Sequence, residues 1–121
     1  MSDNNATKLT LANMWVAFTF FGVAALLGLY QTVERTGLFP GILSPEIYFA
    51  SVSTHGVLMG FVLTTFFIMG FGYYSATTSL KQKLWSPGFA WFGFLLSLIG
   101  VLIAAVPLLT GNASVMYTFY P

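Results

Sequence analysis

The stretch IYFASVSTHGVLMGFVLTTFFIMGFGYYSATTSL, residues 47–80, contains no Asp, Glu, Lys or Arg. A helix needs about 20 apolar residues to cross the hydrocarbon core of a bilayer, so this stretch is long enough to span a membrane. Uncharged stretches also lie on either side of it, at residues 9–30 and 84–121. We therefore predict an all-α membrane protein with three transmembrane helices, at residues 11–31, 45–74 and 87–109.

The composition supports a membrane protein and excludes several other classes. Of the residues, 57% are hydrophobic and 6% are charged, whereas soluble domains have about 25% charged residues. The sequence has no basic patch that would neutralise phosphates, so we expect no nucleic-acid partner. It has no cysteine, which excludes disulfides, thiolate metal sites and cysteine nucleophiles. Phosphate-binding loops, carboxylate pairs and Ser/His/Asp sets are also absent.

Local signals mark the ends of the predicted helices. Ser44-Pro45-Glu46 combines an N-cap residue, a proline at the first helical position and an acid near the positive end of the helix dipole. Ser86-Pro87 repeats the cap-and-proline pattern before the third span, and Gly111-Asn112 is a plausible end for that span. Pro107 is expected to bend its last turn.

The basic residues predict the orientation in the membrane. Lys8 precedes the first span, and Lys81 and Lys83 lie between the second and third spans, whereas the first loop has only Arg35. Short loops that are rich in Lys and Arg stay in the cytoplasm. We therefore expect the N-terminus and the second loop on the cytoplasmic side.

His55 is the one histidine of the sequence, and it lies inside the second span. It is roughly 15 Å along the helix from Pro45, which predicts a place in the outer half of the membrane. An ionisable residue inside a membrane is by default a functional hypothesis, and imidazole is a good ligand for iron, copper and zinc. Gly56 beside it leaves room for a large planar ligand. The position alone fits an interhelical hydrogen bond equally well.

Helix geometry restricts the ligands that His55 can have. Met59 lies four residues later, on the same helix face, so the two side chains cannot both be axial ligands of one haem. A second axial histidine must come from another segment. Ser51, through its hydroxyl or its carbonyl, is a candidate acceptor for the second ring N–H of His55. Small residues on the spans predict close helix contacts or close approach of a flat ligand: Gly22, Gly28, Gly56, Gly60, Gly93 and Gly100.

Two segments resemble subunit I of the heme–copper oxygen reductases. The first is Thr54-His55-Gly56-Val57-Leu58-Met59 in the second span, and the second runs from Ala104 to Pro121 and ends in Tyr-Thr-Phe-Tyr-Pro. The resemblance covers residues 11–121, and the ending is closest to the B-family of these enzymes.

The resemblance implies a fold and a set of cofactors. The chain would be the N-terminal fragment, residues 1–121, of one transmembrane domain, a polytopic bundle of about twelve helices. The full subunit would bind a low-spin haem, b-type in this family, together with a high-spin haem and copper held by later helices. His55 resembles the low-spin haem ligand, Gly56 lies close to that haem, and Tyr117 corresponds to a residue near the high-spin haem.

The resemblance also implies an activity and partners. The full enzyme would reduce dioxygen to water with electrons from cytochrome c and translocate protons in the cytoplasmic membrane. Its partners would be membrane lipid and other oxidase subunits, including a copper-bearing subunit II. We expect this segment alone to be inactive, because the copper histidines and the second haem ligand are not in it.

Three alternatives remain at this point. The first is a haem-free three-span packing or assembly protein in which His55 makes an ordinary interhelical hydrogen bond. The second is a relative of the nitric oxide reductases, against which the Tyr-Thr-Phe-Tyr-Pro ending argues. The third is half of a transporter bundle, which predicts a polar pathway that the spans lack apart from His55. An optical spectrum separates a ligated haem from a packing histidine.

Overall fold

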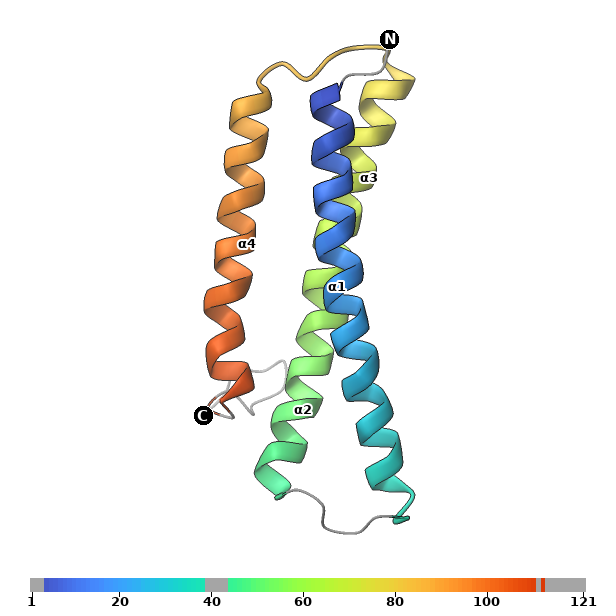
Figure 1. The fold of residues 1–121 in the computed structure, drawn as a ribbon, viewed down its shortest axis with the longest axis vertical. Coiled ribbons are helices and arrows are strands. Elements are labelled where there is room, and N and C mark those ends of the chain that lie inside the picture. Colours follow the sequence, from blue (N-terminus) through green and yellow to red (C-terminus); the bar gives the residue numbers. More distant parts are fainter. Residues whose placement is uncertain (1–3, 39–43, 111, 113–121) are drawn as a thin grey trace.

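The computed structural model describes residues 4–38, 44–110 and 112, and these ranges contain helices and no strand. Three long rods run alternately up and down (Figure 1). The second rod consists of three elements that follow one another without a break and together span 35 residues. The elements are α1 (Asn4–Arg35), α2 (Pro45–Val57), the π-helix η1 (Leu58–Leu63), α3 (Thr64–Ser79) and α4 (Pro87–Leu109).

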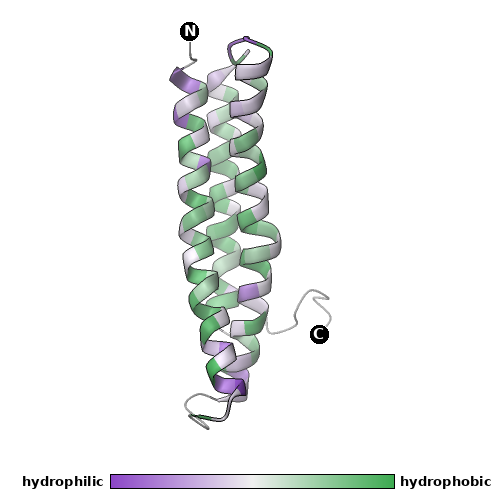
Figure 2. Cartoon of the chain, turned by 90° about the vertical axis from the view of Figure 1, so that its right-hand side faces the viewer, coloured by the Kyte–Doolittle hydropathy of each residue, from purple (hydrophilic) through white to green (hydrophobic). Residues whose placement is uncertain are grey.

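The predicted all-α membrane architecture is confirmed, because all three rods are long and apolar enough to cross a membrane. The helices extend beyond the first two predicted spans. α1 has 32 residues, which is about 48 Å of helix, compared with about 30 Å of hydrocarbon. Its ends therefore reach the headgroup level unless the helix tilts strongly. Figure 2 shows the same distribution, with hydrophobic residues along the rods and hydrophilic residues at both ends.

The two predicted N-caps differ in the structure. Ser86 has an extended backbone, and its hydroxyl accepts a hydrogen bond from the Phe89 N–H at 3.4 Å. Ser44 also precedes its helix with an extended backbone, but its side chain makes no cap bond. The predicted starts of both helices are nevertheless correct, since Pro45 and Pro87 are the first helical residues. Pro107 lies inside the last turn of α4.

The core lies between the first two rods. It consists of five buried residues from α1, η1 and α3: Ala17, Ala24, Leu58, Val62 and Phe66. α4 contributes only partly buried side chains to it, such as Phe94 and Leu98. Most large apolar side chains of α4 remain exposed, which suits a helix whose solvent is lipid or other helices rather than water.

The π-helical segment η1 was not predicted from the sequence. It begins two residues after Gly56 and includes Gly60, two of the small residues for which close contacts were predicted. At its far end, the Thr64 hydroxyl donates to the Gly60 carbonyl at 2.6 Å. A hydroxyl that bonds to a carbonyl one turn earlier offers the backbone an alternative to the regular ladder. π-helical turns inside α-helices are frequent near functional sites.

Most of the predicted glycine contacts are absent in the structure. A Cβ atom added to Gly22, Gly60, Gly93 or Gly100 would meet nothing within 4 Å, so these glycines are not needed for contacts among the described helices. Gly28 does make a close contact, as described below.

Candidate functional site

His55 lies near the end of α2, on the side of the helix that faces α1. Its ring is half-buried, and its Nδ1 atom is 2.7 Å from the backbone carbonyl oxygen of Ala24 in α1. Ala24 is fully buried in the core. A carbonyl oxygen has two lone pairs and can accept a second hydrogen bond besides its helical one. The imidazole is therefore attached to the backbone of the neighbouring helix.

This hydrogen bond determines which nitrogen of His55 is free. A carbonyl oxygen can only accept, so Nδ1 carries the proton and donates it. In the neutral ring, Nε2 then has no proton and keeps its lone pair. Ligating histidines usually have this arrangement, in which one nitrogen donates to a carbonyl and the other binds the metal. With the proton on Nδ1, the ring can bind a metal through Nε2.

Gly28 provides the space that the ring occupies. A Cβ atom at this position would lie 3.0 Å from Cε1 of His55 and 3.3 Å from its Nδ1. Such distances are too short for an ordinary van der Waals contact, so any side chain here would push the ring away from Ala24. The sequence marked Gly28 only as one of several small residues, and the structure shows that it lies directly against His55.

A second polar contact joins the two helices one turn before His55 in α2. The Gln31 side chain is buried, and its Nε2 donates to the Ser51 carbonyl at 3.0 Å. The Ser51 hydroxyl donates to the Tyr48 carbonyl at 2.7 Å. The hypothesis that Ser51 accepts the ring N–H of His55 is therefore wrong, because both groups of Ser51 have other partners and Ala24 is the acceptor.

A third contact lies at the end of the same interface where α1 ends. The Arg35 Nε donates to the Tyr48 hydroxyl at 2.7 Å. The Tyr48 ring also meets the Tyr30 ring edge-on, with 6.5 Å between centroids. Together with the bonds of His55 and Gln31, this contact makes a row of polar links along the antiparallel helices. The row resists sliding and rotation of α2 on α1 and so keeps His55 in place.

The other predicted site residues have less definite positions. Gly56 is buried in α2 beside His55. Met59 is half-buried in η1 and packs against the core cluster. Tyr117 lies outside the described residues, so its predicted position stays a prediction.

The available donors fit a haem iron better than a metal held by protein alone. Across residues 4–38, 44–110 and 112, no three His, Cys, Asp or Glu side chains come together. A metal held by protein ligands alone would need such a group. A haem needs only one or two axial ligands from the protein. His55, whose ring is held by the Ala24 carbonyl through Nδ1, satisfies that smaller requirement with Nε2.

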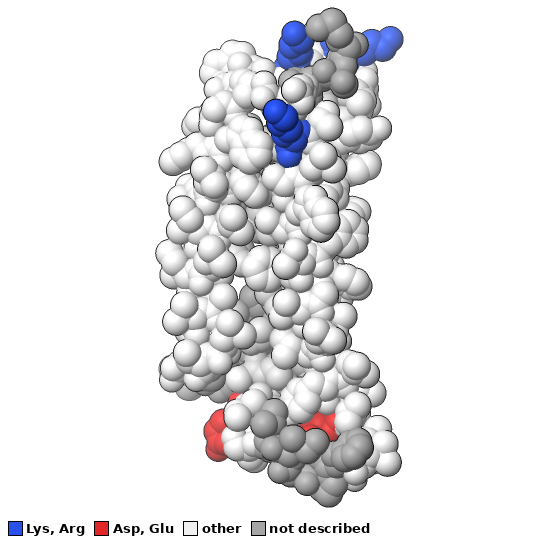
Figure 3. All heavy atoms as spheres, in the orientation of Figure 1, with Lys and Arg blue, Asp and Glu red and all other residues white. Residues whose placement is uncertain are grey.

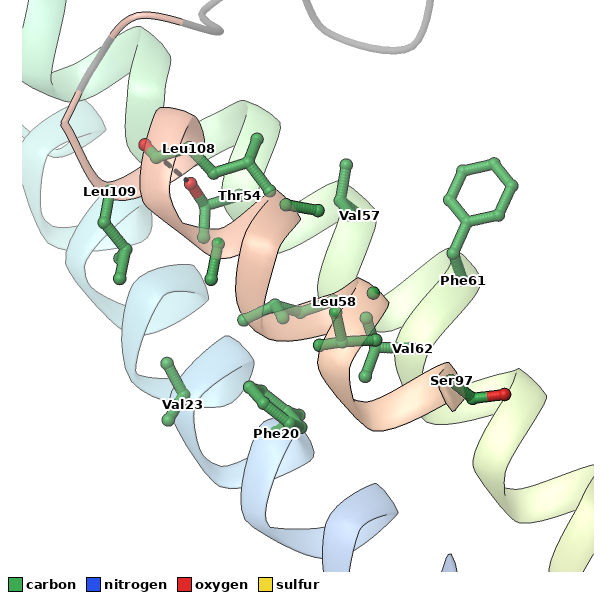
Figure 4. Close-up of a pocket in the computed structure, with 14 residues that line it drawn as sticks. Phe20, Val23, Thr54, Val57, Leu58, Phe61, Val62, Ser97, Leu108 and Leu109 are labelled. Atoms are coloured by element: carbon green, nitrogen blue, oxygen red, sulfur yellow. Dashed lines mark hydrogen bonds between the residues drawn. The ribbon is translucent and has the colours of Figure 1, made fainter. Parts of the chain in front are cut away.

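A separate apolar cavity of about 430 Å³ lies between α1, the second rod and α4 (Figure 4). Thr54 and Ser97 are the two polar residues in its wall, and His55 does not line it. The Thr54 hydroxyl donates to the Ala50 carbonyl at 2.8 Å and is 3.4 Å from the Leu108 carbonyl of α4. The cavity offers no group for acid–base or metal chemistry. Thr54, next to His55 in the sequence, instead links the last turn of α4 to α2.

Comparison with known proteins points to one family. Residues 8–121 match the family described as cytochrome c and quinol oxidase polypeptide I. The chain is also similar to cytochrome c oxidase subunit 1 of Thermus thermophilus, with 31% identity over 120 residues. The match covers 94% of this chain and 21% of the relative, so the chain spans about a fifth of the relative's length. No solved structure matches the chain significantly.

Proposed function

Because the chain belongs to the cytochrome c and quinol oxidase polypeptide I family, we propose that it contributes an axial haem ligand, His55, to an oxidase. In this proposal the full subunit takes electrons from cytochrome c, reduces dioxygen to water and translocates protons. The observation that supports it best is the 2.7 Å contact between Nδ1 of His55 and the Ala24 carbonyl, which leaves Nε2 free for iron.

The residues of this chain hold the ligand in one orientation. The Ala24 carbonyl keeps the proton on Nδ1, and hydrogen bonding of this kind raises the basicity of the ligating nitrogen. Gly28 lets the ring lie against α1, and Gln31 prevents α2 from shifting along it. When bound at Nε2, a low-spin b-type haem would supply reversible one-electron chemistry.

The remaining parts of the proposal concern the whole oxidase. Gly56 would lie close to the low-spin haem, and Tyr117 would lie near a high-spin haem. That haem and a copper ion would be held by residues outside this chain, which contains one histidine and no cysteine. We propose that the complex includes a copper-bearing subunit II and lies in the cytoplasmic membrane, with the N-terminus of this chain in the cytoplasm.

One observation also favours the haem-free packing role. That role predicts an interhelical hydrogen bond from His55, and the bond to Ala24 is such a bond. The two functions differ at Nε2 of His55. A haem ligand binds iron through this atom, whereas a packing histidine needs no second partner. A test must therefore read out the haem and the stability of the protein separately.

The test compares His55→Ala and His55→Gln in the full oxidase complex. We expect both variants to lose the sharp reduced band of the low-spin haem and to contain less haem by the pyridine haemochrome assay. Ile47→Ala, an exposed position in the same helix, serves as the control and should keep the spectrum. Unchanged haem spectra in both His55 variants, with only a lower melting temperature, would show the packing role instead.

A further inference from the structure

The described lysines gather at one end of the bundle. Lys8 lies near the start of α1, and Lys81 and Lys83 lie in the connection between α3 and α4. All three side chains are exposed. Figure 3 shows blue side chains at this end and the acidic side chains at the other end, where α1 ends with Arg35. The acidic residues within the described ranges are Glu34 and Glu46, so none of them neutralises the lysines.

The backbone adds positive charge at the same level. α4 begins here, directly after Ser86, and has no acidic residue in its first turn. The first N–H groups of a helix carry a partial positive charge that favours a nearby anion. At the opposite end, α2 has the usual arrangement, with Glu46 in its first turn. Lys83, three residues before Ser86, adds a like charge to the start of α4, so an external anion would relieve the repulsion.

Exposed apolar side chains flank the two loop lysines in the sequence. Trp85 is 96% exposed, Phe89 is 73% exposed and Leu80 is 69% exposed. Tryptophan is typical of the membrane–water interface, where one side is apolar and the other is wet. A free phosphate ion would satisfy the lysines but leave these side chains uncovered. A ligand that satisfies both features has an anionic headgroup and acyl chains.

We propose that the start of α1 and the α3–α4 connection bind an anionic phospholipid of the bilayer. The positive charge of Lys8, Lys81 and Lys83 attracts the anionic headgroup, and the acyl chains lie against Leu80, Trp85 and Phe89. Each lysine near an anionic membrane surface favours binding by about fivefold, so the three lysines select anionic over zwitterionic lipid. This surface shares no residue with the His55 site and does not depend on the proposed haem.

The test uses the full oxidase complex in phosphatidylcholine vesicles, with a fluorophore on a unique cysteine introduced by Gln82→Cys between the two loop lysines. Brominated phosphatidylglycerol or brominated phosphatidylcholine is added at equal mole fraction. We expect severalfold stronger quenching by the anionic lipid. The combined Lys8→Gln, Lys81→Gln and Lys83→Gln variant should lose this preference, and Arg35→Gln at the opposite end should keep it.

Three results would overturn the proposal. Equal quenching by the two lipids in the otherwise native complex would show that the surface does not select anionic lipid, and this result requires no lysine variant to fold. A preference that survives removal of all three lysines would place the lipid elsewhere. A preference abolished by millimolar inorganic phosphate, but not by the same ionic strength of sodium chloride, would show a site for a free anion rather than a lipid.

Discussion

At the scale of single residues, the position of one proton decides what His55 can do. The Ala24 carbonyl keeps that proton on Nδ1, and the ring has room to reach this carbonyl because residue 28 is glycine. Ala24 and Gly28 both belong to α1, whereas His55 belongs to α2. The chemistry of the site therefore depends on how closely the two helices approach each other at this level.

The first prediction concerns Gly28→Ala in the full complex. The added Cβ would lie 3.0 Å from Cε1 of His55 and displace the ring from Ala24. Loss of such a supporting contact typically lowers metal affinity by about 10- to 100-fold. We also expect a higher midpoint potential, because a less basic imidazole stabilises the ferric state less. Spectroelectrochemical titration and haem quantitation measure both effects.

The matched control is Gly22→Ala in the same helix. A Cβ at this position meets nothing within 4 Å, so the haem content and the potential should stay at their native values. If Gly28→Ala and Gly22→Ala behave alike, Gly28 does not position the ligand.

Sequence reasoning identified His55 but not the residues that position it. A lone histidine in an uncharged span is visible from residue type and spacing. The role of Ala24 is carried by a backbone carbonyl, which every residue has, and its partner is 31 positions away in the sequence. Ser51 was a reasonable candidate acceptor from helical spacing. The interhelical partner was instead supplied by tertiary packing, which helical spacing does not report.

At the scale of the helices, the half of the bundle that contains the start of α1 depends on a close crossing of α1 and α3. Gly70 lies at this crossing and is buried. A Cβ added to it would lie 3.1 Å from Cβ of Asn13 and 3.2 Å from the backbone oxygen of Thr10. The backbone atom cannot move aside as the end of a flexible side chain can. Gly70 therefore sets the distance between the two rods.

The second prediction follows from this contact. Gly70→Ala should destabilise the complex, by about 1–3 kcal/mol if it behaves as other overpacked sites do. Gly72→Ala is the control, because a Cβ there meets nothing within 4 Å. A thermal melt followed by intrinsic fluorescence compares the two variants. Equal melting temperatures would mean that the α1–α3 crossing adjusts without cost.

The elements differ in how well the sequence predicted them. The starts of α2 and α4 were predictable, because Ser-Pro pairs give a local signal that does not depend on the rest of the fold. The π-helical segment Leu58–Leu63 was not predictable, because its residues are also common in regular membrane-spanning α-helices. No pattern of hydrophobic residues in the sequence indicates a change from α-helical to π-helical hydrogen bonding.

At the scale of the whole molecule, the chain forms three long apolar rods, and the two ends of the bundle carry different charged residues. One end has the described lysines and the other has the described glutamates (Figure 3). The three spans were predictable from the uncharged stretches alone. The buried faces of the helices were not predictable from the sequence. A uniformly apolar helix such as α4 has no polar side to mark its exposed face, and most of its apolar surface is exposed.

The third prediction is the orientation in the membrane. Single cysteines replace Gln82 between α3 and α4 and Thr36 after α1 in the full oxidase. A membrane-impermeant maleimide should label Gln82→Cys only in inverted vesicles and Thr36→Cys only in intact spheroplasts, because Lys-rich short loops stay in the cytoplasm. The reverse labelling pattern would place the N-terminus of the chain outside.

A cryo-EM map of the full oxidase complex, at a resolution that shows side chains, would show directly whether His55 binds a haem. We expect a flat macrocycle whose iron lies on Nε2 of His55, while Nδ1 remains within hydrogen-bonding distance of the Ala24 carbonyl. A map in which Nε2 of His55 contacts only protein or lipid, with no macrocycle beside it, would instead make His55 a packing residue.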